Sequence, residues 1–79
     1  MTTGKEYNHY YKDVKAYDYI DVYRVLTLFE VDNPCIQHAI KKLLCAGQRG
    51  DKDSYQDIDE AIDSLKRYKD MRDEDYNNV

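Results

Sequence analysis

The chain has 79 residues and a mass of 9.4 kDa; 42% of its residues are hydrophobic, 35% are charged, and the net charge is -4. This length excludes a multidomain machine, because there is room for only one small domain. A domain of this size buries only about 60% of its unfolded surface and often gains stability from a second subunit, so we expect a homo-oligomer. No run approaches the roughly 18 apolar residues of a membrane span, and the polar start is unlike a signal peptide, so we expect no membrane association.

Charge is distributed unevenly along the chain. Residues 51–75 hold ten acids and five bases, whereas residues 35–50 hold three bases and no acid. A duplex DNA ligand demands a broad basic surface, which this chain lacks. A small phosphorylated ligand needs only two or three cations and a few N–H groups. The sequence therefore excludes duplex DNA as a partner and permits a nucleotide.

The first third of the chain is rich in tyrosine. Residues 1–17 show no sustained period, and we expect an arm whose tyrosines dock on the rest of the protein. From residue 18 onward apolar side chains recur at steps of three and four, which predicts an amphipathic helix reaching about residue 31. Tyr19 and Tyr23 belong to this stripe, so we expect them in the core.

Local signals delimit two further helices. Asn33 followed by Pro34 predicts a helix start and Gly47 a helix end, which gives a helix over 34–46. Residues 47–53 form a solvated connection. Ser54 and Asp57 have the spacing of a capping box, and an apolar stripe predicts a helix over 55–68.

These elements define the predicted fold class. We expect an all-α protein with a Tyr-rich arm over 1–17, a three-helix domain over 18–69 and an acidic flexible tail over 70–79.

The helix over 34–46 has two stripes. At 100° per residue one stripe is apolar and faces the core, and it consists of Ile36, Ala39, Ile40 and Leu43. His38, Lys42 and Cys45 lie on the opposite side, and Arg49 would continue their line. This polar stripe is either a solvated surface or a surface that faces a ligand or a subunit.

The spacing of the cysteines argues against a zinc site. Cys35, His38 and Cys45, with His9 as a fourth ligand, raise the question of zinc, but ten residues of helix separate the two thiolates too widely for one tetrahedral ion. We therefore predict no metal site.

The acids of the last helix could in principle hold Mg²⁺. Glu60 and Asp63 lie opposite its apolar stripe, however, and are typical of solvated surface. Asp57 is the acid best placed to meet residues 47–53. This connection offers N–H groups and cations suited to phosphate, although it is not a P-loop.

Four segments together resemble a family of small phage proteins. They are His9-Tyr10, the stretch 19–22, the stretch 38–50 (HAIKKLLCAGQRG) and the stretch 57–65 (DIDEAIDSL). The family includes the region shared with a phage nucleotide kinase that acts on thymidylates without a P-loop. The resemblance covers residues 9–68 and implies a helical, phage-encoded, nucleotide-associated protein of the host cytoplasm. The chain departs from the family pattern at His38, Lys42 and Cys45; the last replaces an arginine, so the resemblance leaves open whether a bound nucleotide reacts.

From residues and resemblance together we expect a protein that binds a nucleotide or nucleotide-like ligand and could sequester it from the host. Phosphate would be neutralised by Lys41, Lys42 and Arg49, and the base would stack on Tyr10. Sugar or base would be bound by the polar side chains of His9, His38 and Asp57.

Two alternatives stay open. One is an acidic protein-binding inhibitor of a host defence system or host enzyme, acting as a nucleic-acid mimic or as a plug for a basic groove through the last helix and the residues from 70. The other is an active nucleotide kinase. We expect no cofactor, except Mg²⁺ if phosphoryl transfer occurs.

Overall fold

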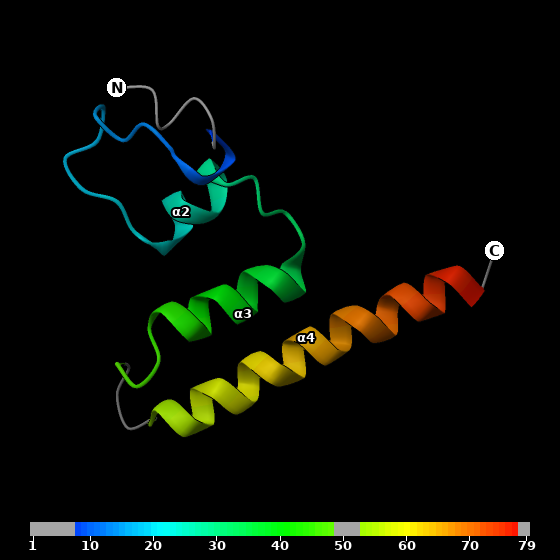
Figure 1. Ribbon diagram of the computed structural model, residues 1–79. Helices are drawn as coiled ribbons and strands as arrows, with labels where there is room; N and C mark the ends of the chain where they lie inside the picture. The colour runs from blue at the N-terminus through cyan, green and yellow to red at the C-terminus, as the bar shows by residue number, and fades with distance from the viewer. Residues whose placement is uncertain (1–7, 49–52, 78–79) are drawn as a thin grey trace. The chain divides into compact units, whose positions relative to one another are not determined.

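The computed structural model describes residues 8–48 and 53–77, and the chain divides into two compact units at residues 31 and 32. The described residues form three α-helices and a short 3-10 helix, and they include no strand (Figure 1). The all-α prediction is thus confirmed. The division into an arm, a three-helix domain and a tail stays a prediction, and the two units are described separately below.

The first unit contains the 3-10 helix η1 (Asn8–Tyr10) and the helix α2 (Val22–Leu28). The start of α2 is fixed by Asp21, whose side chain accepts a hydrogen bond from the backbone N–H of Arg24 at 2.9 Å. An N-cap of this kind satisfies a backbone donor that has no partner within the helix. The helix therefore begins at residue 22 and not at residue 18, where the apolar period begins.

A tight cap ends α2. Glu30 has a φ of 56°, which places a non-glycine residue in the left-handed region. Its N–H donates to the carbonyl of Thr27, and the N–H of Val31 donates to the carbonyl of Leu26. This pair of hydrogen bonds is the Schellman motif, which most often has glycine at the left-handed position. The expected helix over 18–31 is therefore only seven residues long.

Leu26 is the buried apolar residue among residues 9–31. Tyr19 and Tyr23, expected in the core, are 89% and 64% exposed. That expectation is wrong for both residues. Tyr19 precedes the helix and so does not belong to its apolar stripe.

Cations contact aromatic rings in the same unit. The Arg24 guanidinium lies 4.6 Å from the centre of the Tyr17 ring, and Lys12 Nζ lies 5.3 Å from the centre of the Phe29 ring. Both distances suit a cation–π interaction. Through them, residues before α2 contact the helix and its C-cap.

The second unit begins with α3 (Pro34–Leu44). The Asn33 side chain accepts hydrogen bonds from the N–H groups of Cys35 and Ile36 at 2.9 and 3.2 Å. Pro34 occupies the first helical position, where its missing N–H costs nothing. The predicted start is confirmed, whereas the helix ends two residues earlier than residue 46.

Gly47 makes the turn after α3 possible. Its φ is 74°, and a Cβ at this position would lie 3.3 Å from both Cβ and N of Ser54. Glycine therefore serves both the left-handed backbone and the close approach of the next helix.

The last helix, α4 (Ser54–Asn77), starts from a cap that differs from the predicted one. Asp53, not Ser54, accepts the N–H of Gln56 through its side chain at 2.9 Å. The predicted capping box is thus out of register by one residue. Asp57 is consequently not a capping residue, and its carboxylate is available for another contact.

The predicted end of α4 near residue 68 is also wrong, because the helix continues to Asn77. No glycine or proline interrupts it. Arg67 and Glu74 pair across its exposed surface at 2.8 Å, and Arg72 donates to the hydroxyl of Tyr68 at 3.0 Å. An apolar stripe is thus not needed to continue this helix.

α3 and α4 pack side by side as an antiparallel hairpin (Figure 1). Gly47 contacts Asp57, whereas His38, nine residues earlier, contacts Ser64, seven residues later. Ala39 and Ala61, each 2% exposed, are the buried apolar residues described in the hairpin. Their small side chains let the helix backbones approach closely.

Candidate functional site

The most deeply buried polar groups of the described chain lie in one cluster between α3 and α4. Asp57 is fully buried and Lys42 is 7% exposed. Lys42 Nζ lies 3.8 Å from Asp57 Oδ1 and 2.6 Å from Glu60 Oε1. The backbone N–H of Gly47 donates to Asp57 Oδ2 at 2.8 Å. One carboxylate thus joins the end of α3, the turn after it and the first turns of α4.

The local sequence explains how these groups meet. Asp57 and Glu60 are three residues apart and share one face of α4. Lys42 follows Ala39 by three residues, so its side chain follows the same face of α3. The alanines open space along this face, and the long side chain of Lys42 fills it with methylene groups while its ammonium reaches the two acids.

Opposite charges stabilise the cluster. One ammonium group lies between two carboxylates, and a backbone N–H supplies a further charge-assisted hydrogen bond. Burial makes each charge expensive without its partner, so these groups hold one another in place. The cluster is suited to fixing the register of the hairpin, and its ammonium is already committed to two internal acids.

The polar stripe of α3 therefore faces α4. His38 Nδ1 lies 2.5 Å from the Ser64 hydroxyl of α4, and Lys42 is buried next to the same helix. Conversely, Leu43, expected in the core, is 50% exposed. The side of α3 that faces α4 is thus not the side predicted to face the core. Among the residues of the predicted apolar stripe, Ala39 is the most deeply buried.

The expected nucleotide-site residues are only partly brought together. Lys42 and Asp57 meet, but through the ion pair described above, and His38 lies on the same helix–helix seam. Lys41 is half-buried, and Arg49 lies outside the described residues.

His9 and Tyr10 belong to the first unit. Their ring centres are 4.0 Å apart, and Tyr10 is 67% exposed. Among the described site residues, one contact joins Lys42 to Asp57 and another joins His9 to Tyr10.

Glu60 is the member of the buried cluster that the sequence analysis missed. It was expected at the solvated surface, yet it makes the shorter of the two contacts to Lys42. Its spacing of three from Asp57 was the signal that could have placed it toward α3.

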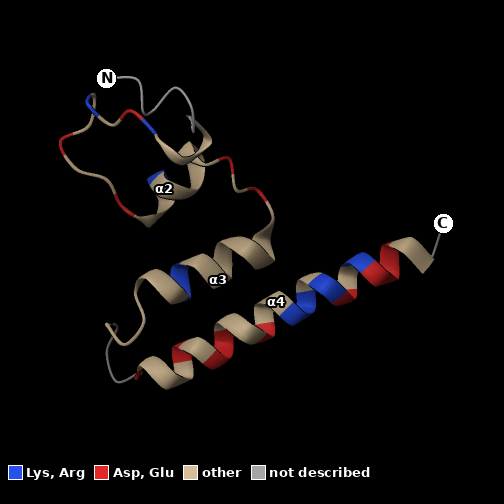
Figure 2. Ribbon diagram, viewed as in Figure 1, with Lys and Arg blue, Asp and Glu red and all other residues tan. Residues whose placement is uncertain are grey.

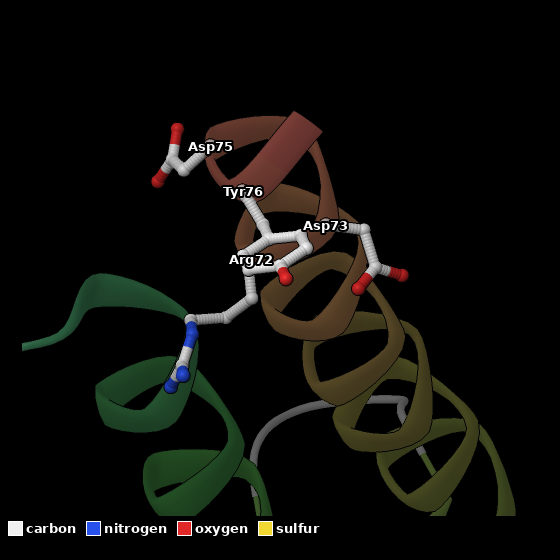
Figure 3. A pocket seen from close by; sticks show the side chains of 4 residues that line it. All are labelled: Arg72, Asp73, Asp75 and Tyr76. Atoms are coloured by element: carbon white, nitrogen blue, oxygen red, sulfur yellow. The ribbon is translucent and has the colours of Figure 1, made fainter. Parts of the chain in front are cut away.

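A second feature lies near the end of α4, in the segment expected to be a tail. Arg72, Asp73, Asp75 and Tyr76 line an open hollow. Figure 3 shows Arg72 and Tyr76 next to one another and the carboxylates of Asp73 and Asp75 pointing to opposite sides. Tyr76 is 80% exposed. This combination of an exposed phenol with charges of both signs suits contact with a polar surface.

Arg67 lies about one turn before this hollow. Its pKa is raised above the ordinary value by the hydrogen bond to Glu74 and by the charge of Glu74. Both side chains are about half exposed. Arg67 therefore stays charged at any working pH and adds to the alternating charges on this helix.

Two further properties concern metals and membranes. Among residues 8–48 and 53–77, no three His, Cys, Asp or Glu side chains are grouped as a metal site would require. Cys35 and Cys45 are free and half-buried. Within the same ranges no helix combines the length and the hydrophobicity of a membrane span.

Comparisons with models of protein families, with curated proteins and with solved structures found no match. The resemblance to small phage proteins, with the phage origin, host location and nucleotide association that it implies, therefore stays a prediction.

Proposed function

We propose that this chain works by binding a protein partner, through the acid-rich exposed surface of α4. One observation carries the proposal: Lys42 and Asp57, two of the residues expected at the nucleotide site, are buried against each other. Most of the charged side chains of α4, by contrast, stay exposed.

The charge of α4 suits a basic partner. Its 24 residues hold eight acids and four bases, a net charge of -4 that equals that of the whole chain. Figure 2 shows acids in the first half, bases in the middle and mostly acids near the end. Acids on a rigid helix attract a basic groove and direct its approach, with an effect that salt weakens.

The length of α4 supports the same proposal. At 1.5 Å per residue α3 spans about 16 Å and α4 about 36 Å. Since Gly47 meets Asp57 and His38 meets Ser64, the first turn of α3 reaches about residue 68 of α4. The final turns, with Arg72 and Tyr76, therefore extend beyond the hairpin and can enter a groove on another protein. Inhibition of a host enzyme or defence system would be one use of such a helix.

The test compares two variants with the same change in charge. The first neutralises the end of α4 with the substitutions D70N, D73N, E74Q and D75N. The control neutralises four exposed acids outside α4 with D13N, D18N, E30Q and D32N. Each chain is immobilised and incubated with candidate host lysate, and captured proteins are identified by mass spectrometry.

We expect wild type and control to retain one stoichiometric partner that about 0.5 M salt releases, and the first variant to lose it. Capture of the partner at full yield by the first variant would contradict the proposal, and so would the absence of any partner.

Nucleotide binding is a second proposal, and the exposed Tyr10 with the His9 ring against it is the observation that favours it. A phenol of this kind can stack on a base. Calorimetry with a panel of nucleotides and cyclic nucleotides tests the proposal, and Tyr10→Ala should abolish any heat. No heat at tens of micromolar would refute it. Turnover of a deoxynucleoside monophosphate with ATP and Mg²⁺ would in addition identify a kinase.

A further inference from the structure

The hairpin carries an apolar face that neither of its helices covers. Three residues of each helix form it, with the same spacing of four and then three residues. This hairpin face consists of Ile36, Ile40 and Leu43 of α3 and Ile58, Ile62 and Leu65 of α4. In α4 these side chains are 37%, 44% and 42% exposed, and Leu43 is 50% exposed.

Both triplets lie on one side of the hairpin. Leu43 follows the buried Lys42 by one residue, and Ile58 follows the buried Asp57 by one residue, so each is rotated by 100° around its helix from that buried residue. Because the helices are antiparallel and right-handed, the same rotation in both leads to the same side. The six side chains thus form one continuous surface.

The hairpin requires a cover on this face. Its seam buries two alanines and an ion-paired cluster, which is too little apolar surface to hold a two-helix unit. Six aliphatic side chains on one side would supply the missing core if they packed against another surface.

We propose that a second copy of this chain covers the hairpin face, so that two hairpins form a four-helix bundle. The pattern of charge along α4 selects this occupant. Asp59 and Lys66 directly follow Ile58 and Leu65 and are both exposed, so they flank the apolar triplet of α4 at its two ends. Figure 2 shows the change from acids to bases between them.

A twofold axis through the middle of the triplet makes the two α4 helices antiparallel. Asp59 of one copy then lies opposite Lys66 of its partner, and symmetry repeats the pair. The opposite orientation would set acid against acid and base against base. Two copies of the face are therefore both apolar in the middle and complementary in charge at the ends.

Sedimentation equilibrium of the full chain from about 1 to 200 µM tests the proposal. The wild-type chain should be a dimer. Ile62→Glu places a charge in the interface twice and should raise the dissociation constant on the order of 100-fold or more. Met71→Glu is the matched control, because Met71 is 39% exposed and lies nine residues, or 2.5 turns, from Ile62 on the opposite side of α4. The control should dimerise like the wild type.

Charge reversal provides a second test at exposed positions that the fold does not need. Asp59→Lys and Lys66→Glu should each weaken the dimer about 10-fold, and the double variant should restore it, since the pair is only inverted. Circular dichroism confirms that each variant is helical. A chain that is monomeric throughout this range, a dimer that Ile62→Glu leaves intact, or single reversals without effect would each overturn the proposal.

Discussion

Replacing Lys42 with methionine probes the buried cluster most sharply. Methionine keeps most of the volume of the lysine stem and removes the ammonium that lies 3.8 Å from the fully buried Asp57 carboxylate. Breaking a buried ion pair from one side typically costs about 3–5 kcal/mol. A 79-residue protein has a total stability of about 4–12 kcal/mol at 0.05–0.15 kcal/mol per residue, so Lys42→Met should remove about a quarter of it or more.

Asp57→Asn should cost less, about 1–2 kcal/mol, for two reasons. The amide oxygen can still accept the N–H of Gly47, and Lys42 keeps Glu60 at 2.6 Å. In the double variant no charge is left unpaired at position 57, so the two costs should fall short of additivity by about 1–3 kcal/mol.

Urea denaturation followed by circular dichroism, at one fixed protein concentration, measures these differences. With a slope of about 1 kcal/mol per molar urea, Lys42→Met should lower the midpoint by about 3 M or leave the chain unfolded in buffer. A Lys42→Met variant within about 0.5 kcal/mol of the wild type would refute the reasoning, because an exposed lysine awaiting phosphate behaves in that way. Strict additivity in the double variant would refute the pairing itself.

Three further predictions concern single contacts. Gly47→Ala should lower stability by about 1–2 kcal/mol in the same urea assay, since φ is 74° and the new Cβ would press on Ser54; no loss would mean that this turn has another conformation. Glu30→Gly should raise thermal stability by up to about 1 kcal/mol, because glycine relieves the left-handed position that ends α2, and a loss would contradict the described cap. Glu74→Gln removes an ion pair whose partners are both about half exposed, so the unfolding midpoint should not move measurably, whereas a large drop would show that the end of α4 is packed against something.

The features that the sequence predicted well are local. Asn33 and Pro34 define the start of α3 by their own chemistry, and Gly47 has the positive φ that its position after a helix requires. Asp57 does meet the turn after α3, as its place near the start of α4 indicated. Each of these follows from a few neighbouring residues, so no knowledge of packing was needed.

The features that it missed depend on which groups meet across the chain. Lys42 was expected on an outer polar stripe because lysine is almost always exposed, and only the acids of α4 make its burial affordable. Glu60 was expected in solvent for the same reason. Apolar periodicity therefore did not identify the side of α3 that meets α4, since this seam combines alanines with a paired charge and leaves larger aliphatic residues such as Leu43 half exposed.

The ends of helices show a second limit. Asp53 and Ser54 are adjacent and both are good caps, so composition alone could not choose between them, and a shift of one residue changed the role expected of Asp57. The continuation of α4 to Asn77 was missed because an apolar stripe was treated as a requirement for a helix. The end of α4 has no such stripe, and polar contacts such as that between Arg67 and Glu74 lie along it instead.

The central claim is that Lys42, one of the three cations which the sequence offers to phosphate, is used inside the hairpin with Asp57. An NMR titration of the ¹⁵N-labelled chain with thymidine monophosphate and with ATP tests this claim most directly. Gly47 donates its amide N–H to a buried carboxylate, so that resonance and the ammonium resonance of Lys42 should keep their positions at millimolar nucleotide. Saturable shifts of both resonances, at a nucleotide concentration that leaves the rest of the spectrum unchanged, would contradict the account.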